Sequence, residues 1–214
     1  MAFPTTSVLD AFNRTNGDLG AGWTSPIYPG ADDWSIVSNV AVPDSWVSPV
    51  FADDYWNAAT FGPNSEAYAD MPTLPQDYCQ DWVSCRLASE GGSSLDGYQV
   101  QYLYIASGTD QIYILRLEGA SNTQLGATIS QDFSNGDSLG IEAIGSAITA
   151  YRKTGGTWAS LGSRTDTTYT AAGHIGMGGD DSTSLLDNFG GGTVAAAGGQ
   201  PPRSMHQFRL RRPA

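Results

Sequence analysis

Apolar and polar residues alternate most regularly between Tyr98 and Met177. Turn-forming pairs such as Asn135-Gly136 and Gly155-Gly156 separate the alternating segments. A period of two is typical of strands with one buried face, and Asn and Gly favour the turns that connect them. This pattern predicts consecutive antiparallel strands. They are expected at residues 98–105, 111–117, 124–129, 138–144, 147–152 and 173–178.

The alternation is weaker upstream of this region. Strands are predicted there at residues 34–37, 47–51, 65–71 and 82–87. The chain has 26 Gly and 11 Pro, and they interrupt the sequence too often for long helices. No repeat of fixed period is present, which disfavours a propeller or a solenoid. The pattern therefore predicts an all-β chain, and 214 residues suit a single domain of this class.

The composition changes after Phe189. We expect one domain at residues 1–192, followed at 193–214 by a Gly/Ala/Pro linker and an extended basic C-terminal arm. An arm of this kind can add a strand to the sheet of a neighbouring protein. The alternative is a disordered, solvated tail. The residues proposed for assembly are Arg203, Phe208, Arg209, Leu210, Arg211 and Arg212.

The formal net charge is −12, which disfavours nucleic acid as a partner because phosphate binding depends on Lys and Arg. No segment approaches the roughly 20 apolar residues needed for membrane insertion. The first residues lack a basic start and an apolar run, so we expect no signal peptide and synthesis in the cytoplasm. Cys79 and Cys85 are too few for a disulfide scaffold, and whether they are bonded is left open.

Several segments, taken in order, resemble the laminin G-like branch of the concanavalin A-like lectin/glucanase superfamily. The match covers roughly residues 8 to 190. The segments that carry it are Asp10-Ala11-Phe12-Asn13-Arg14 with Gly22-Trp23, Trp34 to Asn39, Gly136 to Glu142 through Ile148 to Arg152, and Gly173 to Gly178 followed by Leu186 to Phe189.

This resemblance implies a two-sheet antiparallel jelly-roll sandwich. In that fold the first and last strands commonly pair, which here would join Asp10-Ala11-Phe12 to Asp187-Asn188-Phe189. The superfamily includes carbohydrate-binding modules, adhesins, sialidase accessory domains, glucanases, and bacteriophage tail and capsid proteins. The resemblance thus implies a fold and leaves several functions open.

Hydrolysis by this fold would require two carboxylates on one strand face, typically as Glu-x-Asp-x-x-Glu. No such motif is present. Glu66 with Asp70 has the wrong spacing, and the adjacent Asp53 and Asp54 point to opposite faces of a strand. We therefore predict a non-enzymatic protein without catalytic residues. Gly176-Met177-Gly178-Gly179 lacks the Lys-Ser/Thr of a phosphate loop and is expected to form a turn.

Sugar binding would use exposed aromatic rings beside carboxylates or amides. One segment supplies both types of group, so it is the candidate glycan-binding site. Its residues are Trp46, Asp53, Asp54, Tyr55 and Trp56. The alternative is that these rings belong to the core, because sandwich cores are rich in aromatic residues.

No cofactor is required by these assignments. A structural calcium ion is the metal considered, since the superfamily often binds it with carboxylate and carbonyl oxygens. Candidate ligands are Asp10, Asp180, Asp181 and Asp187. The alternative is that these aspartates are water-exposed turn and cap residues.

The function expected from these observations is that of a bacteriophage virion protein, either a capsid decoration or a tail component. Its partners would be other virion proteins, copies of itself and a host-surface glycan. The first alternative is a free carbohydrate-binding module, and the second is a glycoside hydrolase of the same fold. The sequence does not distinguish head from tail placement.

Overall fold

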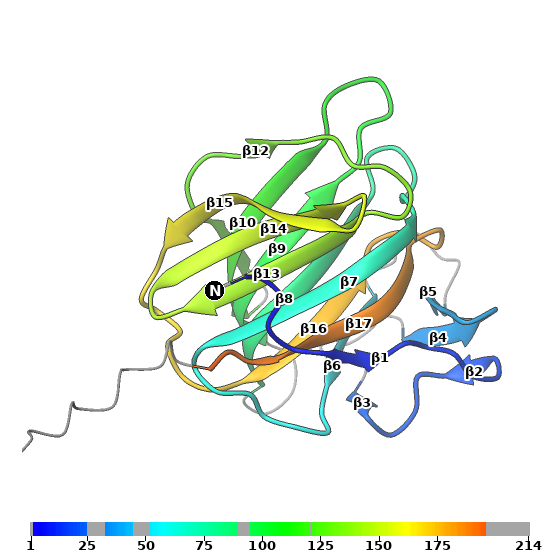
Figure 1. Cartoon of the computed structure of the whole chain (residues 1–214), viewed down its shortest axis with the longest axis horizontal. Coiled ribbons are helices and arrows are strands. Elements are labelled where there is room, and N and C mark those ends of the chain that lie inside the picture. Colours follow the sequence, from blue (N-terminus) through cyan, green and yellow to red (C-terminus); the bar gives the residue numbers. More distant parts are fainter. Residues whose placement is uncertain (1, 25–32, 45–51, 90–94, 120, 196–214) are drawn as a thin grey trace, which may run out of the picture.

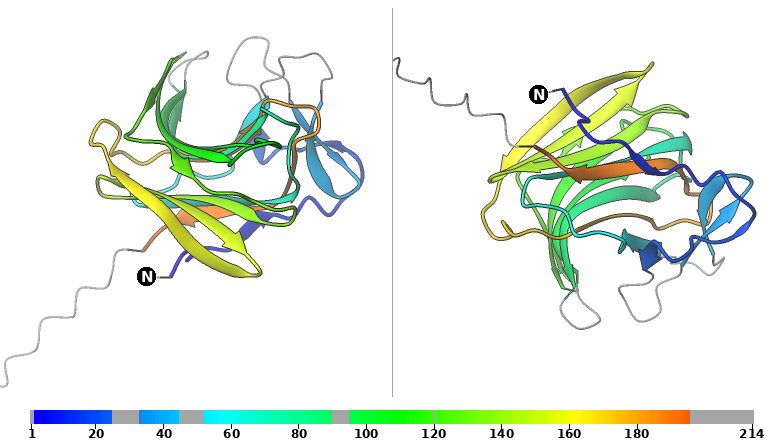
Figure 2. Two further views of the ribbon diagram at one scale, coloured as in Figure 1. Left: turned by 90° about the horizontal axis from the view of Figure 1, so that it is seen from above. Right: turned by 60° about the horizontal axis from the view of Figure 1, so that its bottom comes forward.

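The computed structural model describes residues 2–24, 33–44, 52–89, 95–119 and 121–195. Their strands form two antiparallel sheets packed face to face (Figures 1 and 2). The predicted all-β jelly-roll sandwich is confirmed. In this part of the chain, no helix is long and apolar enough to cross a membrane. The strand predicted at residues 47–51 lies outside the described residues.

In the described part of the chain, the first sheet has nine strands. Its order is β15-β14-β13-β7-β17-β5-β4-β2, and β1 pairs with β17. The bounds are β1 Val8–Asp10, β2 Gly17–Asp18, β4 Trp34–Val37, β5 Val40–Pro43, β7 Ser65–Thr73, β13 Ser138–Ile144, β14 Ala147–Thr154, β15 Thr157–Thr165 and β17 Leu185–Thr193.

The second sheet has eight strands among the same described residues. Its order is β11-β10-β9-β8-β16-β6-β3, and β12 pairs with β10. The bounds are β3 Trp23–Thr24, β6 Ala52–Trp56, β8 Gln80–Ser89, β9 Leu95–Leu103, β10 Gln111–Gly119, β11 Ser121–Gln124, β12 Ile129–Ser130 and β16 His174–Gly179.

The core lies between the sheets and contains alternate residues of most long strands. In β9, Tyr98, Val100 and Tyr102 are fully buried in it, as the alternation predicts. In β13, Leu139 and Ile141 contribute from the opposite sheet. Since every second residue points into the core, the intervening residues form the outer faces of the sandwich.

The first and last strands pair as expected. Val8 lies opposite Gly190, and Asp10 lies opposite Phe189. The Asp10 carboxylate accepts hydrogen bonds from the Trp23 indole, the Phe12 backbone and the Arg14 guanidinium. Burial opposes its ionisation, but these bonds outweigh burial and lower the pKa of Asp10. This carboxylate therefore ties the N-terminal segment to the body.

The prediction of one strand at residues 124–129 is wrong. β11 ends at Gln124 and β12 begins at Ile129, with Gly126 between them at a φ of +73°. The Arg164 side chain donates hydrogen bonds to the carbonyl oxygens of Leu125 and Ala127. An arginine distant in the sequence thus satisfies backbone groups that a strand would have paired.

The turn predicted at Gly176-Met177-Gly178-Gly179 is also wrong, because these residues form most of β16. The three glycines among them occupy positions that have no space for a side chain. A Cβ at Gly176 would lie 2.7 Å from the Asp54 carbonyl oxygen, and one at Gly179 would lie 2.7 Å from Ser184 Oγ. Close neighbours, and not a turn, account for the glycines here.

Candidate functional site

The candidate site is the outer face of the eight-stranded sheet. Asp53 of β6 and Trp82 of β8 both lie opposite Gly178 of the central strand β16. Residues directly opposite each other in neighbouring strands share one face of a sheet. Because Met177 and Val83 point into the core, the side chains of Asp53 and Trp82 lie on the face turned away from it.

Trp82 lies across the backbone of β16. A Cβ at Gly178 would be 2.2 Å from two indole atoms of Trp82, Cε2 and Nε1. The indole Nε1 donates a hydrogen bond of 3.2 Å to Asp53 Oδ1. Glycine at position 178 therefore lets the Trp82 ring reach across one strand to the carboxylate of the next.

Asp53 is the acidic group of this face. It is 4% exposed, and burial raises the pKa of Asp53 to about 7 despite the opposing hydrogen bond from Trp82. Trp82 is also 4% exposed. The two residues form a buried pair that combines an aromatic ring with a carboxyl group.

Amides and hydroxyls continue this face across β8, β9 and β10. Gln101 donates a hydrogen bond to the Gln80 side chain, and the Tyr113 hydroxyl donates one to Gln111. All four side chains are partly exposed. Within the described ranges, the fully buried Ser84 Oγ has no hydrogen-bond partner. The face therefore presents neutral donors and acceptors next to the Trp82–Asp53 pair.

The other end of the face is apolar. Leu87, Leu95 and Leu117 form a small cluster separate from the main core, and Tyr55 packs against it. The Tyr55 ring also lies 4.9 Å from the His174 ring, centroid to centroid. The outer face thus changes along its strands from polar side chains to leucines.

The structure divides the predicted glycan-binding residues between two faces. Asp53 and Tyr55 lie on the outer face. Asp54 is fully buried and lies beside the core residue Met177, to which it is paired across the strands. Trp56 packs against the main core, with its ring edge-on to Trp23 at 5.4 Å. Trp46 lies outside the described residues.

Sequence reasoning missed most of this face. Trp82, Gln80, Gln101, Gln111 and Tyr113 were placed on predicted strands or beside them without a role. The signal available was the polar half of the alternation at positions 99, 101, 111 and 113. Such positions are usually solvated faces, so they gain a role only when the register brings them beside Trp82.

The predicted calcium ligands do not fit a metal site. Asp10 is already bonded to Arg14 and Trp23, and Asp187 accepts hydrogen bonds from Asn188. Asp180 and Asp181 belong to another region, where they bind the backbone N–H groups of Gln80 and Gln76. Within the described ranges, no three His, Cys, Asp or Glu side chains are grouped to hold a metal ion.

Two other predicted features are located as follows. Cys79 and Cys85 are free thiols in the structure. At the predicted domain end, Thr193 completes β17, and Val194 is buried and donates its backbone N–H to the Asn64 carbonyl. The assembly arm lies outside the described residues. It comprises Arg203, Phe208, Arg209, Leu210, Arg211 and Arg212.

No family model matches the chain, and no curated protein matches it. Solved structures do. The carbohydrate-binding module CBM66 from Bacillus subtilis superposes with a TM-score of 0.60 at 14% identity, over 83% of this chain and 97% of that one. The Bacillus licheniformis beta-glucanase gives 0.57 at 12%, over 87% and 97%.

A third similar structure is the CBM2 module of the evolved Dit protein from Lactobacillus casei BL23 phage J-1. Its TM-score is 0.56 at 11% identity, over 87% of this chain and 94% of that module. The chain therefore has the concanavalin A-like lectin/glucanase fold. Sequence identities this low establish the fold alone, and the fold is shared by binding modules and hydrolases.

Proposed function

We propose that this protein is a non-catalytic glycan-binding domain and that the outer face of the eight-stranded sheet is its binding surface. The observation that carries the proposal is the row of partly exposed side chains Gln80, Gln101 and Tyr113, which lies beside the buried Trp82–Asp53 pair. A sugar ring offers an apolar face for an aromatic ring and hydroxyls for amides and carboxyls.

The polar groups of this face suit an uncharged polyhydroxylated ligand. Amides donate and accept at once, as do hydroxyls, so Gln80, Gln101 and Tyr113 can each bond a sugar hydroxyl in either sense. The relatives in fold include two carbohydrate-binding modules, which agrees with this proposal.

The non-catalytic part of the proposal rests on the carboxylates. Retaining glycosidases place two carboxyl groups about 5 Å apart, and inverting ones about 6.5–9.5 Å apart. Among the described strand residues of the outer face, Asp53 is the sole carboxylate. The full chain incubated with a polysaccharide panel should therefore release no reducing ends. Steady turnover would replace this proposal with glycoside hydrolysis.

Binding is tested with the same panel, using the full chain and two variants. Gln101→Ala and Tyr113→Ala remove partly exposed groups from the face, and each should weaken saturable binding about tenfold or more if it is a binding hot spot. Thr149→Ala on β14 of the other sheet is the matched control and should bind normally. Equal binding by all three variants would contradict the assignment of this face.

We also propose that the domain is carried on a bacteriophage particle, as a capsid decoration or tail component that adheres to host-surface glycans. The fold shared with a phage Dit module supports this placement. The basic arm at residues 203–212 would contact other virion proteins or another copy. Quantitative mass spectrometry of purified particles should find this chain at a fixed ratio to a major capsid or tail protein. Its absence from particles would leave a free carbohydrate-binding module.

A further inference from the structure

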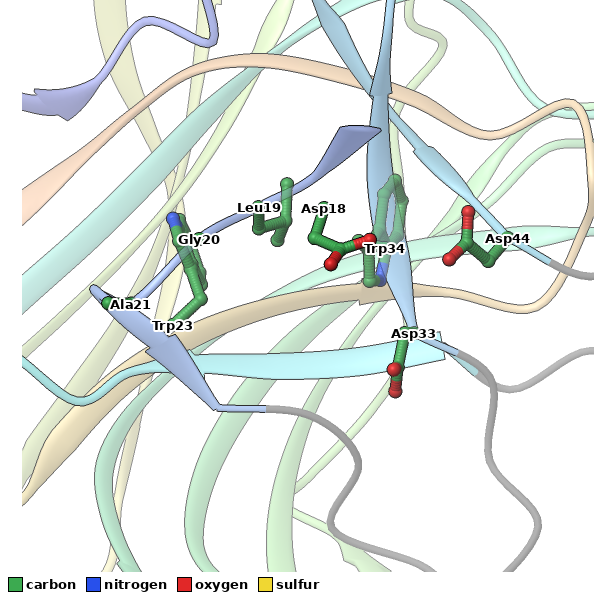
Figure 3. A pocket seen from close by; sticks show the side chains of 8 residues that line it. All are labelled: Asp18, Leu19, Gly20, Ala21, Trp23, Asp33, Trp34 and Asp44. Carbon is green, nitrogen blue, oxygen red and sulfur yellow. The ribbon is translucent and has the colours of Figure 1, made fainter. Parts of the chain in front are cut away.

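A pocket lies where the edges of the two sheets meet, away from the outer face described above (Figure 3). Its volume is about 330 Å³, and residues from β2, β3 and β4 line it. This volume is at the lower end of the range for small-molecule sites, roughly 300–1,000 Å³. The pocket is therefore large enough for one small ligand.

Negative charge surrounds this pocket. Asp18, Asp33 and Asp44 line it and are exposed, and none of the eight lining residues is basic. In Figure 3 the Asp18 carboxylate is drawn next to the ring of Trp34, whereas the Asp33 side chain points away from that ring. A concave surface with one sign of charge attracts ligands of the opposite sign. The pocket therefore favours a cation.

A buried hydrogen-bond donor lies at the same place. Trp34 lines the pocket and is 1% exposed, yet its indole Nε1 has no hydrogen-bond partner among the residues that the structure describes. In Figure 3 this nitrogen lies on the Asp18 side of the ring. A buried N–H without an acceptor is destabilising, and native structures seldom leave a buried donor without a hydrogen bond. The ligand should therefore supply an acceptor oxygen as well as a positive charge.

A metal ion does not meet these requirements. In the part of the chain that the structure describes, no three acidic side chains are close enough together to hold one ion. An ion would also leave the Trp34 N–H without an acceptor. The three carboxylates instead suit a larger organic cation that spans the cavity.

We propose that this pocket binds an amino sugar with a free, protonated amine. The ammonium group is held by the carboxylate of Asp44, in a field to which Asp18 and Asp33 add negative charge. A hydroxyl of the sugar accepts the hydrogen bond of Trp34 Nε1. Trp23, which also lines the pocket, supplies an apolar wall for the sugar ring. This site does not depend on the glycan site of the eight-stranded sheet.

The proposal is tested by calorimetric titration of the full chain with D-glucosamine. Saturable binding that weakens with salt is expected, because charge attraction is screened. Glucose and N-acetylglucosamine lack the charge and should bind roughly tenfold more weakly or not at all. Equal binding of glucose, no saturable binding of glucosamine, or tight binding of calcium chloride alone would overturn the proposal.

Variants locate the bound sugar. Asp44→Asn removes an exposed charge and should weaken glucosamine binding about tenfold, whereas Trp34→Phe should weaken it about fivefold through the lost N–H. Asp132→Asn removes the same charge from an exposed residue elsewhere and should have no effect. If Trp34→Phe fails to fold, Asp44→Asn still tests whether glucosamine binds at this pocket. Glucosamine binding unchanged by Asp44→Asn would refute the site.

Discussion

The outer faces of the two sheets carry similar side chains but differ in what covers them. On the nine-stranded sheet, Phe3 of the N-terminal segment stacks on Tyr151 at 3.9 Å between centroids and lies edge-on to Trp158. Thr5 and Thr6 bind the same oxygen of Glu66 through their N–H and hydroxyl groups. The chain itself occupies this face, as the N-terminal segment in Figure 2 shows.

The eight-stranded sheet instead keeps amides and hydroxyls partly exposed beside Trp82. Both faces seat an aromatic ring on a glycine. A Cβ at Gly140 would lie 2.6 Å from the Phe3 ring, just as one at Gly178 would meet the Trp82 indole. The comparison indicates that the first face serves stability, whereas the second retains hydrogen-bonding groups for a ligand.

The largest expected effect is that of Phe3→Ala. The Phe3 ring is 8% exposed, and removing a buried Phe side chain costs about 3 kcal/mol or more. Urea unfolding should show this loss, and glycan binding by the folded variant should not change. A variant as stable as the parent would show that Phe3 does not hold the nine-stranded face.

Gly178→Ala should cost about 2 kcal/mol, within the range for overpacked sites. The added methyl must displace the Trp82 ring, so glycan binding should fall as well. Gly140→Ala is the matched control, because it displaces Phe3 and should lower the free energy of unfolding without altering binding. If both glycine variants bind glycan equally well, the two faces do not differ as proposed.

Glu66→Gln should cost about 1.5 kcal/mol, since hydrogen bonds to a charged acceptor contribute more than neutral ones. The carboxylate Oε1 accepts from Thr5 and Thr6, and an amide would accept these bonds less strongly. Urea unfolding measures the loss. The double variant Thr5→Val with Glu66→Gln should lose less stability than the sum of the two single variants. Strict additivity would show that Glu66 and Thr5 do not interact.

The smallest change in the free energy of unfolding is expected for Asp53→Asn at low pH. Burial raises the pKa of Asp53 from 3.8 to about 7, so the folded state holds its proton more tightly than the unfolded state. Stability from this group is present in acid and is lost as pH rises from about 4 through 7. Unfolding should therefore give similar stabilities near pH 3, below the unfolded-state pKa, and a more stable Asn variant near pH 8. An Asn variant that is less stable than the parent near pH 8 would contradict this prediction.

The sequence predicts the regular strands well where local pattern and packing agree. The alternation at Ser138–Ile144 matches β13 residue for residue, because both turns flanking it are set by nearby Gly and Asn. The alternation fails at Leu125, because Arg164 from a distant part of the chain sets the conformation there. The separate prediction of a turn at residues 176–179 fails because Gly178 lies in a strand against the Trp82 ring. Local sequence patterns do not encode such long-range contacts.

The candidate site was predicted in part for the same reason. Asp53 and Tyr55 are two residues apart on β6, so they share a face, and a local cluster search finds them. Gln101 and Tyr113 join them through the register of β8, β9 and β10. That register depends on pairing across the sheet, which no short segment encodes.

The most direct test of the glycan site is NMR of the ¹⁵N-labelled full chain, titrated with the tightest oligosaccharide from the panel. The Trp82 indole N–H and the Gln101 side-chain amide should shift in proportion to bound ligand, while the Trp158 indole on the other sheet stays in place. Shifts confined to Trp158 and its neighbours, with Trp82 and Gln101 unmoved, would contradict the assignment of the eight-stranded sheet as the binding surface.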